Sequence, residues 1–182
     1  MSENVVGGGL IETKENIEYY AFNRRFILFS VALLANLVER LVSLMGPVVK
    51  RQIYEVAFTS GKIAGDRMRE YFKGGIGQVE KHVDMIKGLG WGKMKEIKHE
   101  EATGKVTIDF FNSWESSGYS EVQPDQKSEN PVCILSAGMY AGAITGAFDT
   151  MYECEEVLCR NKGDEVCRFE FTPATEKRKI IR

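Results

Sequence analysis

The sequence predicts an α+β fold of two layers, in which an antiparallel sheet of two hairpins packs against helices in the order α-α-α-β-β-α-β-β. Two observations lead to it. Apolar residues recur at intervals of three and four through the first half of the chain, which is typical of helices. Later segments alternate apolar and polar residues and are separated by tight turns, so their strands are antiparallel and the helices cover the sheet they form.

Length and composition favour a single soluble domain. The chain has 182 residues, of which 43% are hydrophobic and 27% charged, values that are ordinary for a globular protein. The net charge is −2 and no basic block occurs, so nucleic acid is not an expected partner. The longest apolar run, residues 26–38, is shorter than the about 20 residues of a membrane span.

The N-terminal part predicts a leader and then a long helix. Residues 1–10 contain three consecutive glycines and are expected to form a flexible leader before one domain over residues 11–182. The helix is expected from about Glu18, with a core stripe of Phe22, Phe26, Phe29, Leu33, Leu37, Leu41 and Leu44. A second stripe, Ile27, Val31, Leu34, Val38 and Val42, would then face a partner, most simply a second copy in a homodimer.

The next segments predict two more helices and a hairpin. Gly46-Pro47 ends the first helix, and the second is expected to direct Val49, Ile53, Val56, Ile63 and Tyr71 inward. A third helix over 77–87 has His82 at the edge of its apolar face. Strands are expected at 93–99 and 105–112, and residues 115–130 read as a polar surface loop.

The C-terminal third predicts a helix and a second hairpin. Asn130-Pro131 is expected to start the helix, because proline suits a first helical turn. Gly138, Gly142 and Gly146 share one face of this helix, which would let another element approach closely. The last hairpin is expected at 152–160 and 165–172, with its turn at Gly163.

Three of the four cysteines lie between residues 154 and 167, in that last hairpin. Cys159 and Cys167 are an even number of residues apart across the turn, so they should share a face. Cys133 lies near the start of the preceding helix, where the helix dipole favours a thiolate. If that helix packs on the hairpin, three thiols converge, and zinc is the ion best suited to them. The alternative is that these cysteines are small buried apolar residues.

A cytoplasmic location is expected, since no segment has the pattern of a cleaved signal. In that compartment cysteines serve metal or redox roles more often than structural disulfides.

Three segments resemble the 4-vinyl-reductase-type domain: "FFNSWES", "GMYAGAITGAFD" and "YECEEVLCRNKGDEVCRFEF". That domain occurs in archaeal stand-alone proteins, in accessory proteins of bacteriochlorophyll synthesis and in phenol-sensing transcription activators. It shares its fold with subunits of the Golgi trafficking particle. The resemblance extends from about Glu18 to the end of the chain.

The resemblance implies a zinc site made by Cys133, Glu156, Cys159 and Cys167. A regular strand would point Glu156 and Cys159 to opposite faces, so a bulge or an irregular strand is required between them. Cys154 is the alternative fourth ligand.

The resemblance also implies a pocket for an aromatic or lipid-like ligand between the helices and the sheet. Trp114 and His82 are the nearest equivalents of the residues that orient phenol in some members. Either residue could instead have a purely structural role, Trp114 in the core and His82 on a helix surface. The predicted loop at 115–130 follows Trp114 directly and could act as a lid.

We therefore expect a non-catalytic, zinc-stabilised, dimeric module that senses a small hydrophobic or aromatic molecule. No acid–base pair, nucleophile or redox-cofactor motif stands out in the sequence, so enzymatic activity is not expected. One alternative is an accessory or reductase role in reduction of a tetrapyrrole 4-vinyl group. A second is a protein-assembly role like that of the trafficking subunits. Haem sensing through His82 and His99 is less favoured.

Overall fold

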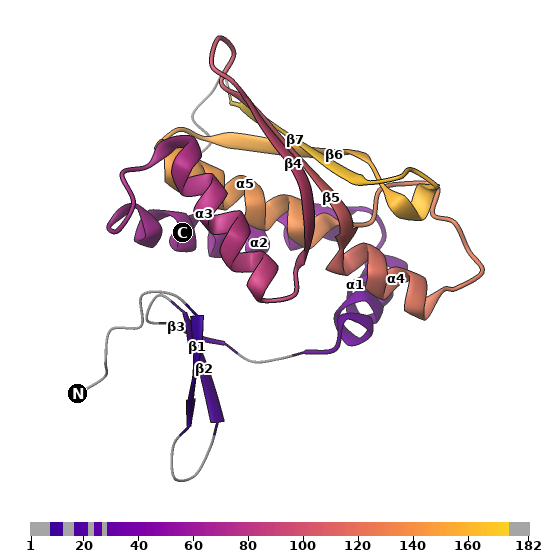
Figure 1. Cartoon of the computed structure of the whole chain (residues 1–182). Coiled ribbons are helices and arrows are strands. Elements are labelled where there is room, and N and C mark those ends of the chain that lie inside the picture. Colours follow the sequence, from indigo (N-terminus) through magenta and orange to yellow (C-terminus); the bar gives the residue numbers. More distant parts are fainter. Residues whose placement is uncertain (1–7, 13–16, 22–23, 27–28, 175–182) are drawn as a thin grey trace.

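The computed structural model describes residues 8–12, 17–21, 24–26 and 29–174 (Figure 1). The first three segments are the strands β1 (Gly8–Glu12), β2 (Ile17–Ala21) and β3 (Arg24–Phe26) of a small antiparallel sheet. The sequence pattern had predicted a helix from about Glu18 here, and that helix start was wrong. Aromatic residues in this segment suit strands, and Ser30 marks the helix start by accepting a hydrogen bond from the Leu33 N–H.

Some N-terminal predictions lie outside the described residues. They are most of the predicted leader, residues 1–7, and the stripe positions Phe22 and Ile27.

The rest of the chain confirms the predicted α+β class and the order of its helices and hairpins. Its elements are α1 (Val31–Met45), α2 (Val48–Arg69), α3 (Gly75–Gly88), β4 (Gly92–Glu100), β5 (Lys105–Ser113), α4 (Trp114–Val122), α5 (Ile134–Phe148), β6 (Tyr152–Leu158), a 3₁₀ turn (Arg160–Lys162) and β7 (Cys167–Pro173). Helix α4 is additional, because it occupies most of the first half of the segment predicted to be a surface loop.

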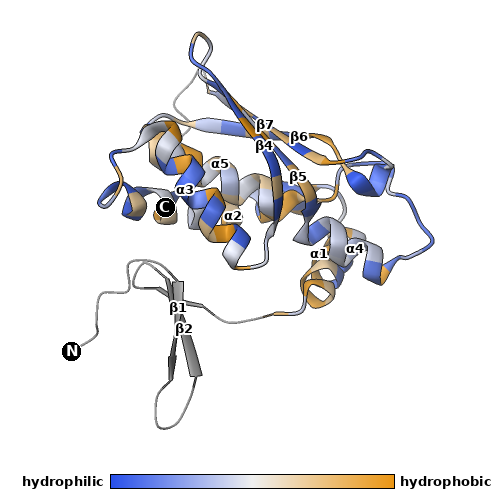
Figure 2. Ribbon diagram, in the orientation of Figure 1, coloured by the Kyte–Doolittle hydropathy of each residue, from blue (hydrophilic) through white to orange (hydrophobic). Residues whose placement is uncertain are grey.

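The main sheet has the strand order β4-β5-β7-β6, and all neighbours are antiparallel. The two predicted hairpins therefore join through β5 and β7. In β7 the residues Cys167, Phe169 and Phe171 are fully buried and alternate with partly exposed Arg168 and Glu170, as the sequence pattern predicted. The helices lie on one side of this sheet, so its other face carries the charged residues (Figures 1 and 2).

Helix α5 packs between the sheet and α2, and glycines set how closely the two helices approach. A Cβ atom at Gly142 would lie well inside van der Waals distance of the Phe58 carbonyl oxygen. Gly138 and Gly146 of α5, and Gly61 and Gly65 of α2, meet the backbone of the opposite helix in the same way. The predicted close approach at the glycine face is therefore confirmed.

Small residues decide which faces of the first two helices are buried, and two sequence interpretations were wrong for that reason. Helix α2 turns Ala57, Gly61 and Gly65 to α5, while Val56, Ile63 and Tyr71, expected inward, are exposed. Helix α1 turns Ala35 and Val38 inward, and Gly118 of α4 meets Val31 and Ala35 at close range. The stripe expected to be core is exposed instead, with Phe29, Leu33, Leu37 and Leu44 at 53%, 56%, 54% and 82%.

Within the described residues, no helix has both the length and the apolar character that a bilayer crossing requires.

Replacing Gly142 by alanine should destabilise the fold by about 3 kcal/mol, because the added methyl group forces α2 and α5 apart. Gly77→Ala is the matched control. A Cβ at Gly77 meets nothing within 4 Å, and alanine is the better helix former by about 1 kcal/mol. Chemical denaturation of both variants measures the difference; equal stabilities would show that the helices are not in close contact.

Candidate functional site

The start of α5 is buried, and two glutamates from other elements satisfy its backbone N–H groups. The helix begins at Ile134, so Cys133 is its N-cap residue and the predicted start at Pro131 was wrong. Glu156 of β6 accepts a hydrogen bond from the Cys133 N–H at 2.8 Å. Glu115 of α4 accepts from the N–H groups of Leu135 and Ser136 at 2.9 and 2.7 Å. Carboxylates suit this position because N–H groups and the helix dipole both attract negative charge.

An irregularity in β6 places Glu156 and Cys159 together. Glu156 pairs with Phe169 and Leu158 with Arg168, so Val157 is an extra residue in the strand. This bulge is the feature that the sequence required if both side chains were to reach one site. Beyond the strand, the Asp164 carboxylate accepts from the Cys159 N–H at 2.8 Å. Gly163 completes the turn with φ 111°, a conformation that favours glycine.

The structure brings together all four residues predicted to bind metal. One ligand atom from each of Cys133, Glu156, Cys159 and Cys167 lies within 4.8 Å of the others. The three cysteines are at most 1% exposed and Glu156 is 8% exposed. The sulfur atoms of Cys133 and Cys167 are 3.8 Å apart, and the cysteines are free thiols. Cys154, the alternative ligand, lies outside this cluster.

Burial controls the protonation of the cluster. Desolvation raises the pKa of Glu156 to about 8 and raises the pKa of the Cys133 thiol well above its usual value. Hydrogen bonds from the thiols of Cys133 and Cys159 lower the pKa of Cys167, so the cluster favours one thiolate. Oε1 of Glu156 accepts no hydrogen bond from the described residues. Three sulfurs and a carboxylate that cannot all be ionised alone form a donor set suited to a thiophilic divalent cation.

A second feature is a small cavity between α3, α5 and β5. It has a volume of about 10 Å³, and among its lining residues are Gln78, His82, Ile108, Tyr140 and Ile144. The lining is mostly apolar, with two polar exceptions. Oε1 of Gln78 and Nε2 of His82 are buried and have no hydrogen-bond partner among the described residues.

The tautomer of His82 follows from its neighbour. Nδ1 lies 3.1 Å from the Met68 sulfur, which can only accept a hydrogen bond, so Nδ1 carries the proton and Nε2 is left as an acceptor. Burial lowers the pKa of His82 to about 4, which keeps the ring neutral near pH 7. His82 is therefore a buried residue at the cavity.

Trp114 does not line the cavity but connects to it through aromatic contacts. Its ring lies edge-on to Trp91 at 5.8 Å, and Trp91 lies 6.3 Å from Tyr140, which does line the cavity. Trp114 begins helix α4, which packs on α1. The part of the predicted lid that directly follows Trp114 is therefore a packed helix, and that interpretation was wrong.

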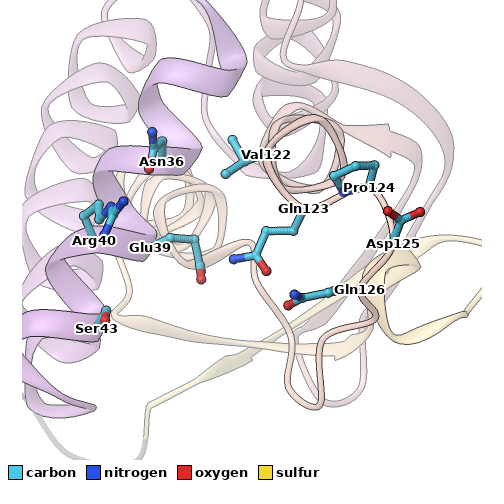
Figure 3. A pocket seen from close by; sticks show the side chains of 9 residues that line it. All are labelled: Asn36, Glu39, Arg40, Ser43, Val122, Gln123, Pro124, Asp125 and Gln126. Atoms are coloured by element: carbon cyan, nitrogen blue, oxygen red, sulfur yellow. The ribbon is translucent and has the colours of Figure 1, made fainter.

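A larger hollow lies away from both features, between α1 and the chain after α4 (Figure 3). Its volume is about 560 Å³ and its lining is mostly polar, with Asn36, Glu39, Arg40 and Ser43 on one side and residues 122–126 on the other. None of the residues predicted to bind metal or ligand lines it.

Sequence reasoning missed two residues that matter here. Glu115 holds the start of α5, but it follows Trp114 in a segment that read as a loop, where no periodicity indicated burial. Gln78 donates from Nε2 to the Gly65 carbonyl at 2.6 Å and presents its other atom near the cavity. A glutamine on the apolar face of the third helix was the available signal.

Comparison with known proteins adds a family and a fold. Residues 114–173 match the family model of the vinyl-4-reductase domain. A search of curated proteins found no match. The phenol-responsive sensory domain of the transcription activator PoxR, solved with phenol, aligns with a TM-score of 0.76 and 18% identity, covering 90% of this chain and 84% of that one.

Two other solved structures align less closely. One is a trafficking protein particle complex subunit 3 from Naegleria fowleri covalently bound to palmitic acid (TM-score 0.53, 14% identity, 82% of this chain and 98% of that one). The other is a vinyl-4-reductase family protein from Methanocaldococcus jannaschii (TM-score 0.48, 16% identity, 79% and 90%). The predicted relationship is confirmed: residues 114–173 carry the pattern of the vinyl-4-reductase, or 4-vinyl-reductase-type, domain, and the chain has the fold of the PoxR sensory domain.

Proposed function

We propose that this protein is a non-catalytic, zinc-stabilised, dimeric module that binds a small aromatic or hydrophobic molecule and serves as a sensor. The observation that carries the proposal is the pairing of a buried thiol–carboxylate cluster with a separate, largely apolar cavity containing unpaired polar atoms among the described residues. The likeness in fold to a phenol-responsive domain supports the same reading. Four free cysteines suit the reducing cytoplasm, where we expect the protein to act.

Zinc is the proposed ion, held by Cys133, Glu156, Cys159 and Cys167. Zinc prefers four ligands and accepts thiolates together with a carboxylate, which is the donor set present. Four protein ligands leave no position for a reactive water, so the ion would stabilise rather than catalyse. It would join the start of α5 to β6 and β7, and would offset the negative charge that burial otherwise opposes.

Cys159→Ser should remove most of the bound zinc and lower stability. The loss should be about 4 kcal/mol when free zinc is a thousandfold above its Kd, because the folded state then loses the ion that stabilises it. Metal analysis and thermal melting measure the two effects together.

Cys154→Ser is the matched control, since Cys154 belongs to the same hairpin but lies outside the cluster; it should retain zinc. The stabilisation by zinc should also decrease as the pH falls below about 8, because protons then compete for Glu156. Wild-type protein that is purified without chelators, is folded and contains no zinc would contradict the proposal.

The cavity is the proposed ligand site. Nε2 of His82 and Oε1 of Gln78 both accept hydrogen bonds, so they favour a neutral molecule with a hydroxyl or amine donor and disfavour a carboxylate. A volume of about 10 Å³ holds no more than a water molecule. An aromatic ring therefore requires neighbouring side chains to move on binding, and a long acyl chain would require much more.

Phenol should bind more tightly than anisole by about tenfold, the value of one hydrogen bond, because anisole lacks the donor. His82→Leu should abolish this preference while leaving the protein folded. Calorimetric titration of both compounds against both proteins measures the effect.

Trp114→Phe serves as the control for fluorescence assays. It should retain binding, because Trp114 lies behind Trp91, and lose part of the signal. If a broad panel of aromatic and lipid-like compounds changes neither fluorescence nor melting temperature, a protein-assembly role replaces the ligand-binding one.

The proposed dimer is formed through the exposed face of α1. Phe29, Leu33, Leu37 and Leu44 are each more than half exposed, and a row of large apolar residues on that scale is uncommon on monomers. Helix α1 is coloured as predominantly hydrophobic in Figure 2. The partner-facing residues are thus proposed to be these, in place of the Val31 and Val38 stripe, which packs inward.

Leu37→Glu should convert the dimer to a monomer at micromolar concentration, because a charge in an apolar interface is poorly solvated. Ser43→Glu, at an exposed position of the same helix, is the control and should leave the dimer intact. Light scattering gives the mass, and a monomeric wild type would refute the dimer. Val38→Glu should unfold the protein instead, since Val38 is buried.

A further inference from the structure

Cys154 is a thiol to which neither the metal cluster nor the ligand cavity assigns a role. It pairs with Phe171 in the sheet, and Glu156 pairs with Phe169, so the two side chains share the inner face of β6 before the bulge. Cys154 is partly exposed, whereas the three cluster cysteines are buried. The chain therefore has one accessible thiol next to the carboxylate of a buried thiol cluster.

A cleft of about 530 Å³ connects these groups to the surface. Its walls are the start of α2, the approach to α5 and residues 153–156 of β6. Cys133 and Glu156, two members of the cluster, line the cleft together with Cys154. Glu156 is only 8% exposed and its Oε1 accepts no hydrogen bond from the described residues. An unpaired buried carboxylate oxygen beside an accessible thiol is a site suited to a cation.

The environment of the cleft fits this purpose. Tyr54 of α2 accepts a hydrogen bond from the Cys154 N–H at 3.1 Å, which fixes this part of the strand edge against the helix. Arg51 is paired with Glu55, so its positive charge is partly offset. Among the described residues, glutamates 153, 155 and 156 line the cleft with only two cations, Lys50 and Arg51.

We propose that this cleft is the loading site for the metal, in which Cys154 and Glu156 capture a thiophilic divalent cation and pass it to the buried cluster. The inference rests on the proposed zinc site. Residues exposed by 8% or less cannot meet a hydrated ion directly, so a metal site of this kind needs an entry path. Transfer is a ligand exchange without oxidation or reduction. Cys154 releases its proton to water when it binds the ion and regains one when the cluster thiols, releasing theirs, take over. Glu156 belongs to both sites.

The test is the rate of zinc uptake by metal-free, full-length protein, followed in a stopped-flow instrument with zinc supplied on a chromophoric chelator. Cys154→Ser and Cys154→Ala should still bind one ion per chain at equilibrium. Their uptake and their release to excess chelator should both be slower by roughly tenfold, the effect typical of losing a supporting group at a metal site. Glu165→Gln is the control, because Glu165 is an exposed acid that does not line the cleft, and it should load at the wild-type rate.

Accessibility gives an independent readout. In zinc-loaded protein Cys154 should be the thiol that iodoacetamide modifies, and that modification should slow metal release without removing the ion.

The outcomes separate this inference from the proposed function. Equal uptake rates in wild type and Cys154→Ser, with one ion bound in each, would overturn the loading role and leave the zinc site intact. A Cys154→Ser variant that binds no ion at equilibrium would make Cys154 a permanent ligand and overturn the transfer. Wild-type protein that takes up no zinc would overturn the zinc site itself, and the loading role with it.

Discussion

The buried start of α5 is the constraint on which the rest of the structure depends. A helix terminus leaves N–H groups without partners inside the helix, and burying them unpaired would be costly. Here Glu156 and Glu115 supply the partners, one from β6 and one from α4. Each glutamate is itself a buried acid, and burial raises the pKa of Glu115 to about 7. The two requirements are met together because helix N–H groups and carboxylates stabilise each other.

This arrangement makes α5 the element shared by the metal cluster and the ligand cavity. Its N-cap residue, Cys133, belongs to the cluster, and Tyr140 and Ile144, about two and three turns further on, line the cavity. Glu115, which holds the start of α5, is adjacent in sequence to Trp114, whose ring leads through Trp91 to Tyr140. A displacement of α5 would therefore act on both features. The close contact with α2 limits such displacement, because backbone meets backbone at the glycines.

Much of the fold and of the candidate site was predictable from local pattern. Alternation in β7 placed Cys167, Phe169 and Phe171 on one face, and the structure buries all three. The parity of Glu156 and Cys159 showed that a regular strand could not present both, and the bulge at Val157 resolves the conflict. His82 was placed at the edge of an apolar face, although its contact with Met68 and its neutral state depend on residues far away in the chain.

The sequence by itself determined the class of the fold, the glycine face of α5 and the residues able to hold a metal, because periodicity and residue type are local properties. Only the tertiary structure decided which stripe of α1 and α2 is buried. Sequence hydrophobicity favours the largest apolar residues, whereas packing selected Ala35, Ala57, Gly61 and Gly65, since small side chains allow helix backbones to approach. The tertiary structure likewise determined the start of α5 and the role of Glu115, because a carboxylate from a distant segment caps that helix in place of a residue next to it in the chain.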